Sequence, residues 1–167
     1  VYAAADHIVQ RTILSERFVQ LERAEAMRDM ERVTAAIEDQ VAQLDRLCLM
    51  KATRDDARAF VAGVNEAYPE VNLSEETLRI ERVDLLYFCA LDGRVVWGAV
   101  RDPETGTAVT LREFPRQELS LTHPLLVGDR QGAGGAVDGI MLTERGPMLA
   151  AARPLLDGGE DGLPLGT

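Results

Sequence analysis

The sequence predicts an α+β protein, in which a long N-terminal helix packs on an antiparallel sheet covered by short helices. The long helix is predicted because residues 1–51 contain no Gly or Pro and are rich in good helix formers. A hairpin is predicted at residues 83–100, where two apolar runs flank the turn dipeptide Asp92-Gly93. A second hairpin is predicted around Arg145-Gly146. Adjacent hairpins with separate helices are typical of the α+β class.

Apolar residues of the first segment recur at steps of three and four, the spacing of a helical stripe. They are Leu14, Phe18, Leu21, Met30, Val33, Ile37, Leu44 and Leu47. At the rise of an α-helix, this segment would be about 75 Å long. Because a compact domain of this size is narrower than that, we expect part of the helix either to be covered by something other than its own domain or to form a free stalk.

Two series of residues in the helix repeat every seven positions, as in the seam of a coiled coil. They are Met30, Ile37 and Leu44, and Val33, Gln40 and Leu47. Val41 and Cys48 widen this face, so that it suits both a partner helix and the chain's own domain. We expect a parallel homodimer through the stalk. The alternative is an amphipathic helix that lies on a single sheet.

Short helices are predicted after the long one. Thr53 is a suitable N-cap for a helix with Asp55-Asp56 in its first turn, where carboxylates suit the helix dipole. Pro69 is expected to end that helix. Another short helix is expected at about Glu75–Ile80, after Ser74.

The second half of the chain is predicted to be mostly strand and loop. The second hairpin has expected strands at Ile140–Thr143 and Met148–Leu155, and a last strand is expected from Leu165. Prolines at 115 and 124 and the glycines of residues 132–135 indicate loops between the hairpins. This order is the outline of a PAS-like module. We expect a stalk helix at 1–51 and a PAS-like domain at 52–167, together forming one structural domain.

Composition excludes several classes of protein. The 167 residues carry a net charge of −10, which argues against binding nucleic acid or an anionic membrane surface. A hydrophobic content of 46% is enough to bury a core. No apolar run is long enough to span a membrane, and no signal peptide is present. We therefore expect the chain to be an excised segment of a longer protein.

No catalytic or metal-binding motif is found. His7 and His123 are far apart and have no metal-ligand spacing, so no catalytic residue, metal or cofactor is expected. Cys48 and Cys89 could form one disulfide if the compartment is oxidising. The alternative is that both remain buried free thiols. A third and distant hypothesis is that the chain is a small hydrolase. Such an enzyme would turn over generic ester substrates.

A ligand site is predicted between the sheet and the segments that cover it. Its candidate residues are Tyr87, Trp97, Arg153, Asp55, Asp56, Tyr68 and His123. Aromatic walls, one cation and nearby carboxylates suit a small carboxylate or zwitterion better than a lipid. For each aromatic residue the alternative is core packing, for the aspartates it is compensation of the helix dipole, and for Arg153 it is a strand position that faces solvent.

Several strings of the sequence resemble the fourth class of CHASE domains, the extracellular sensor regions of bacterial diguanylate cyclases, histidine kinases and chemoreceptors. The strings are Phe18–Leu47, Asp55–Val61, Leu91–Val100 and GPMLAAARPLL followed by PLGT. Ala52, Asp55 and Asp56 match the family pattern near the second helix. The chain departs from that pattern at Met50, Lys51 and Arg54, where the family has an aspartate and two tryptophans.

The resemblance implies a periplasmic ligand-sensing domain held between two transmembrane helices of a signalling protein. Ligand binding would shift the stalk helix or the dimer packing, and a cytoplasmic output domain would respond. The competing hypothesis is a structural dimerisation module without a small-molecule ligand.

Overall fold

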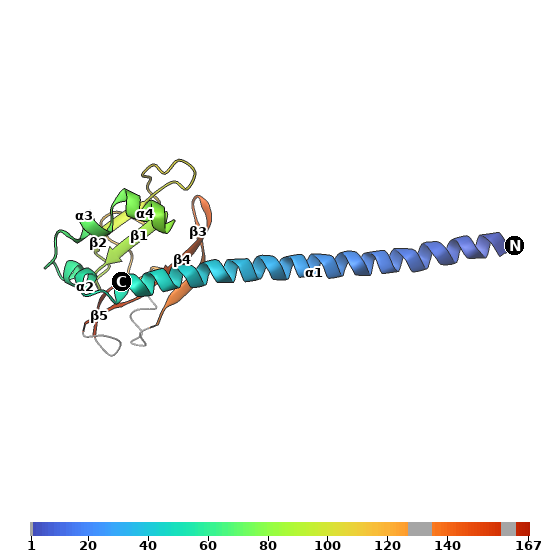
Figure 1. The fold of residues 1–167 in the computed structure, drawn as a ribbon, viewed down its shortest axis with the longest axis horizontal. Coiled ribbons are helices and arrows are strands. Elements are labelled where there is room, and N and C mark those ends of the chain that lie inside the picture. Colours follow the sequence, from blue (N-terminus) through green and yellow to red (C-terminus); the bar gives the residue numbers. More distant parts are fainter. Residues whose placement is uncertain (1, 127–134, 158–162) are drawn as a thin grey trace. The chain divides into compact units, whose positions relative to one another are not determined.

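The computed structural model describes residues 2–126, 135–157 and 163–167 (Figure 1). Its helices are α1 (Tyr2–Ala52), α2 (Asp55–Val61), α3 (Tyr68–Asn72) and α4 (Glu75–Glu81). Its strands are β1 (Leu85–Cys89), β2 (Val95–Val100), β3 (Val137–Thr143), β4 (Gly146–Ala152), β5 (Leu155–Asp157) and β6 (Leu163–Gly166). The α+β class is confirmed.

The long helix α1 is continuous through Glu25 and covers the predicted span. The contacts of the chain divide it into two compact units, residues 1–40 and Val41–Thr167, with the boundary inside α1. The last three turns of α1 therefore belong to the same unit as the strands. In the described part of the chain, no helix is both long and apolar enough to cross a membrane.

Strands β1 and β2 form the predicted hairpin around Asp92-Gly93. Gly93 has a φ of +89°, and a Cβ atom there would lie 2.5 Å from the carbonyl oxygen of Leu119. Only glycine fits this turn without strain, because it has no Cβ atom. The pairing register shifts between Phe88 and Cys89, which places a bulge near the end of the hairpin.

The two faces of this hairpin are both buried. One face contributes Leu86 and Phe88 to a core that includes Phe60, Tyr68 and Leu155. The other face belongs to a second core, formed by Leu85, Tyr87, Cys89, Val100, Leu111, Phe114, Leu119 and Leu126, among others. Strand alternation predicts this division, since successive side chains point to opposite faces.

The two predicted hairpins do not pair with each other to form one antiparallel sheet. The described strands pair as β1 with β2, β3 with β4, and β5 with β6, each antiparallel. At Cys89 the edge of β1 is occupied by the C-terminal residues, because the Thr167 amide donates to the Cys89 carbonyl at 2.8 Å. Ala90 also bridges Gly166. Consequently, this part of the edge has no backbone groups left for β3 or β4.

The predicted strand at Met148–Leu155 is divided. Strand β4 ends at Ala152, and Leu155 begins β5 after Arg153 and Pro154. Proline has no N–H group with which to continue the ladder. The turn of the β3–β4 hairpin lies one residue earlier than predicted, because Gly146 already pairs with Thr143.

Two predictions about the short helices were wrong. Thr53 does not cap α2, because its hydroxyl donates to the carbonyl of Leu49 at 2.9 Å and Arg54 occupies the cap position. Pro69 does not end α2 but lies in the first turn of α3, where a missing N–H costs nothing. Ser74 caps α4, as its hydroxyl accepts the Thr77 amide at 3.2 Å. The glycine loop predicted at 132–135 lies outside the described residues, except for Gly135.

Candidate functional site

The last turns of α1 are joined to the segment between β4 and β5 by an ion pair. The Arg153 guanidinium donates from Nε and Nη2 to the two carboxylate oxygens of Asp45, both at 2.6 Å. The two side chains are 25% and 20% exposed, so water is partly excluded from the pair. The hydrogen bonds from Arg153 lower the pKa of the Asp45 carboxyl, against an opposing effect of burial. Asp45 is therefore an anion at neutral pH.

A thiol extends this contact by one turn of the helix. The Cys48 Sγ donates to the carbonyl oxygen of Ala151 on β4 at 3.4 Å. Burial raises the pKa of the Cys48 thiol to about 11. Cys89 is buried in the second core, and burial raises its pKa to about 12. Both cysteines are free, and each is a neutral thiol at neutral pH.

A buried cation completes the set of contacts near the end of α1. Lys51 is only 7% exposed, and its ammonium lies 2.9 Å from both carboxylate oxygens of Glu81 at the end of α4. A buried ammonium requires such a partner, because the loss of its hydration is costly. We call the residues Asp45, Cys48, Lys51, Glu81 and Arg153 the helix clamp.

The helix clamp joins α1 to two segments that are far apart in sequence, the β4–β5 junction and α4. In Figure 1 the end of α1 passes beside β4, in agreement with these hydrogen bonds. These hydrogen bonds and ion pairs are directional and partly buried, and they attach the last turns of α1 to both segments.

Sequence reasoning identified Arg153 but missed Asp45, its partner. The spacing of residues along the long helix could have identified Asp45 as a residue that faces the domain. Val41, Asp45 and Cys48 follow one another at steps of four and three, so the aspartate lies on the apolar face of the helix. A carboxylate on a face that packs against the domain indicates a buried cationic partner.

Tyr68 and Trp97 lie at the first core. The Tyr68 ring stacks on Phe60 at 5.3 Å, and Phe88 meets both rings edge-on. Tyr68 is 2% exposed, and Trp97 packs partly buried against the same cluster. Burial raises the pKa of the Tyr68 hydroxyl. These contacts make both residues part of the hydrophobic core.

Tyr87 and His123 meet at Phe114, in the second core. The Tyr87 hydroxyl donates to the Phe114 carbonyl at 2.7 Å, and the imidazole of His123 lies edge-on to the Phe114 ring at 5.1 Å. The His123 Nδ1 accepts the Leu125 amide at 3.3 Å, so the neutral ring carries its proton on Nε2. Burial lowers the pKa of His123, and a hydrogen bond with the Glu113 backbone opposes this effect.

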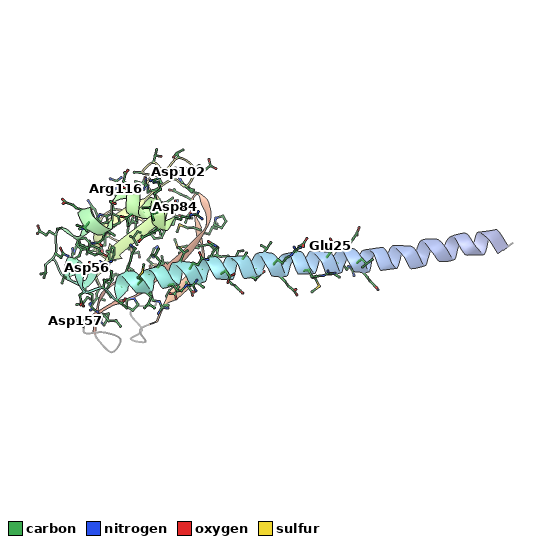
Figure 2. The ribbon with its side chains drawn as sticks, in the orientation of Figure 1. Glu25, Asp56, Asp84, Asp102, Arg116 and Asp157 are labelled. Carbon is green, nitrogen blue, oxygen red and sulfur yellow. The ribbon has the colours of Figure 1, made fainter. Side chains whose placement is uncertain are left out.

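Asp55 and Asp56 stand at the N-terminal end of α2, where Figure 2 labels Asp56. Asp56 accepts hydrogen bonds from Arg54 at 2.9 and 2.6 Å, and Asp55 pairs with Arg58. The hydrogen bond from Arg54 lowers the pKa of Asp56. Arg58 also donates to the Leu156 carbonyl at 3.3 Å, which ties α2 to β5.

The structure thus groups the predicted site residues by pairs. Tyr68 with Trp97 and Tyr87 with His123 belong to the cores on opposite faces of the β1–β2 hairpin. Arg153 holds a carboxylate of the chain itself. In the described ranges, no three acidic, histidine or cysteine side chains form a group that could hold a metal ion.

The architecture is a long helix followed by a small α+β domain. The family model described as the CHASE4 domain matches residues 36–167, so the chain belongs to the CHASE4 domain family. CHASE4 domains are extracellular sensor domains, which confirms the family resemblance and a general role in sensing. In comparisons with curated proteins and with solved structures, nothing matches the chain.

Proposed function

We propose that the chain is the periplasmic ligand-sensing domain of a membrane-bound signalling protein, and that α1 carries the ligand state towards a cytoplasmic output domain. Transmembrane helices on both sides of the domain would connect the two. The observation that carries the proposal is the ion pair between Asp45 and Arg153, because it couples the β4–β5 junction directly to α1.

The ligand we propose is a small carboxylate or zwitterion, and Arg153 is its main contact. A guanidinium binds a carboxylate with two parallel hydrogen bonds, the arrangement that Arg153 makes with Asp45. A ligand carboxylate would take the place of Asp45. The exchange would free Asp45 and loosen α1 from the domain, which converts binding into a signal.

The ammonium of a zwitterion would require a carboxylate near Arg153. Asp55 has a side chain that is 94% exposed, and it lies on α2, which is tied to β5 through Arg58. Asp56 is the second candidate. Tyr68 and Trp97 would shape the floor of the site from the core that includes Leu155, whereas Tyr87 and His123 lie on the opposite face of the β1–β2 hairpin and would not line the same site.

A thermal-shift screen of small carboxylates, amines, amino acids and divalent metals tests this function. A ligand that binds the native state raises the melting temperature by mass action. Arg153→Ala should abolish the shift by a carboxylate, whereas Asp45→Asn should enlarge it, because the internal competitor is neutralised. Arg145→Ala is the matched control, since Arg145 makes an ion pair with Asp102 elsewhere on the domain.

The competing function is a structural dimerisation module, favoured by the exposed apolar side chains of α1. A screen without any hit would support it. We also propose that the chain forms a parallel homodimer through α1, in which Met30, Val33, Ile37, Leu44 and Leu47 are the candidate contacts.

A further inference from the structure

One face of α1 carries a regular seam with a single polar member. The seam follows alternating steps of four and three along the helix and consists of Ala26, Met30, Val33, Ile37, Gln40, Leu44 and Leu47. Met30 is 70% exposed and Val33 is 60% exposed in the single chain. Gln40 is exposed as well. A repeat of this kind buries its apolar side chains against another helix with the same spacing.

The charges of α1 between Ala24 and Gln43 are compatible with a second copy of the chain as that other helix. Between Ala24 and Gln43, the charged residues are Glu25, Arg28, Asp29, Glu31, Arg32, Glu38 and Asp39. All except Asp29 fall at heptad positions that point away from the seam, and Figure 2 shows Glu25 projecting from the helix. Asp29 borders the seam but pairs with Arg32 of its own helix. Between Ala26 and Leu47, two identical seams therefore meet without facing like charges, whereas Arg23, the next position before Ala26, would face its own copy.

We propose that Gln40 holds two α1 helices parallel and in register, by pairing with Gln40 of a second copy of this chain. The inference rests on the homodimer proposed above and adds the residue that specifies its geometry. In a parallel pair in register, each seam residue faces its own copy. The two amides then face each other, and each offers a donor and an acceptor.

Other arrangements leave the amide without a partner. A slip of one heptad places Gln40 of one helix opposite Val33 or Leu47 of the other. An antiparallel pair can keep the two amides together only by centring on Gln40, which places Met30 opposite the exposed Met50 rather than another seam residue. A buried amide that faces only apolar side chains loses its hydrogen bonds to water. Gln40 therefore selects one arrangement at a cost in affinity.

Cysteine cross-linking of the whole chain tests the proposal, on a Cys48→Ser background. Chains with Ile37→Cys are oxidised alone and after mixing with chains that carry Met30→Cys. With Gln40 present, we expect cross-links between two copies of position 37 and almost none between positions 30 and 37. With Gln40→Leu, the offset cross-links should rise to a level comparable with the matched ones. The same substitution should tighten self-association by about tenfold.

The cross-linking results distinguish failure of the proposed role of Gln40 from failure of the proposed homodimer. If Gln40→Leu leaves the matched cross-links dominant, the role of Gln40 is overturned while the homodimer stands. If Ile37→Cys gives no cross-link with Gln40 present, the homodimer itself is overturned. Gln43→Leu is the matched control, because Gln43 is an exposed glutamine of the same helix that borders the seam, as Asp29 does, without being one of its members. An equal increase of offset cross-links with Gln43→Leu would also overturn the proposal.

Discussion

Arg153 binds the carboxylate of Asp45 through two hydrogen bonds of 2.6 Å, although the two residues lie 108 positions apart in the sequence. One partner belongs to α1 and the other follows β4, so the pair attaches the end of the long helix to the segment between β4 and β5. A geometry with two parallel hydrogen bonds restricts both side chains, and it is the arrangement in which arginine recognises carboxylates most specifically.

Removing one member of this pair should destabilise the domain. We expect Asp45→Ala to lower the free energy of unfolding by about 1–3 kcal/mol, because the partly buried guanidinium loses its partner. A double-mutant cycle with Arg153→Ala, followed by urea denaturation, should give a coupling energy of about 0.5–3 kcal/mol. Glu38→Ala, at an exposed position of α1, is the control and should change stability little. Additive effects of the two substitutions would contradict the pairing.

The buried Lys51 should depend on Glu81. Glu81→Gln leaves the ammonium, which is 7% exposed, without an anionic partner, and we expect a loss of about 1–3 kcal/mol in denaturant unfolding. Glu76→Gln on the exposed side of the same helix is the matched control. Equal stability of the two variants would show that Lys51 does not need the Glu81 charge.

His123 should make the domain sensitive to mild acid. Its pKa is lowered from 6.5 in the folded chain, so the unfolded chain binds the proton more readily. Stability from this residue is fully present above pH 6.5 and is lost progressively as the pH falls below 6.5 towards the lowered pKa of the folded chain. Thermal melts between pH 8 and pH 5 should show the loss in the parent chain and a smaller one in His123→Phe. Asp45, whose pKa is lowered from 3.8, affects stability only at more acidic pH, which separates the two effects.

Gly166 should not tolerate a side chain. A Cβ atom there would lie 2.2 Å from the carbonyl oxygen of Cys89, and the backbone of β1 cannot move away cheaply. We expect Gly166→Ala to detach the C-terminal residues from β1 and to speed hydrogen exchange of the Thr167 amide, which donates to Cys89. Gly135→Ala, where a Cβ atom meets nothing within 4 Å, is the control. Unchanged exchange in Gly166→Ala would argue against this close approach.

Much of the secondary structure was predictable from local pattern. The helix α1 (Tyr2–Ala52) followed from the absence of Gly and Pro in residues 1–51, and the first hairpin from Asp92-Gly93, because these signals act between neighbours in the chain. The caps were less predictable. Thr53 has a suitable side chain for an N-cap, but a competing hydrogen bond to the carbonyl of Leu49 was available one turn back.

The sequence by itself determined the helix, the two hairpins, the alternation that sends Tyr87 and Phe88 to opposite faces, and the CHASE4 family. Only the tertiary structure decided that Arg153 faces Asp45 and that Lys51 faces Glu81. It also decided that the C-terminal residues, rather than the second hairpin, occupy the edge of β1 at Cys89. The physical reason is that propensity and periodicity depend on residues a few positions apart. A choice among several charged partners or strand edges depends on which segments the hydrophobic cores bring together.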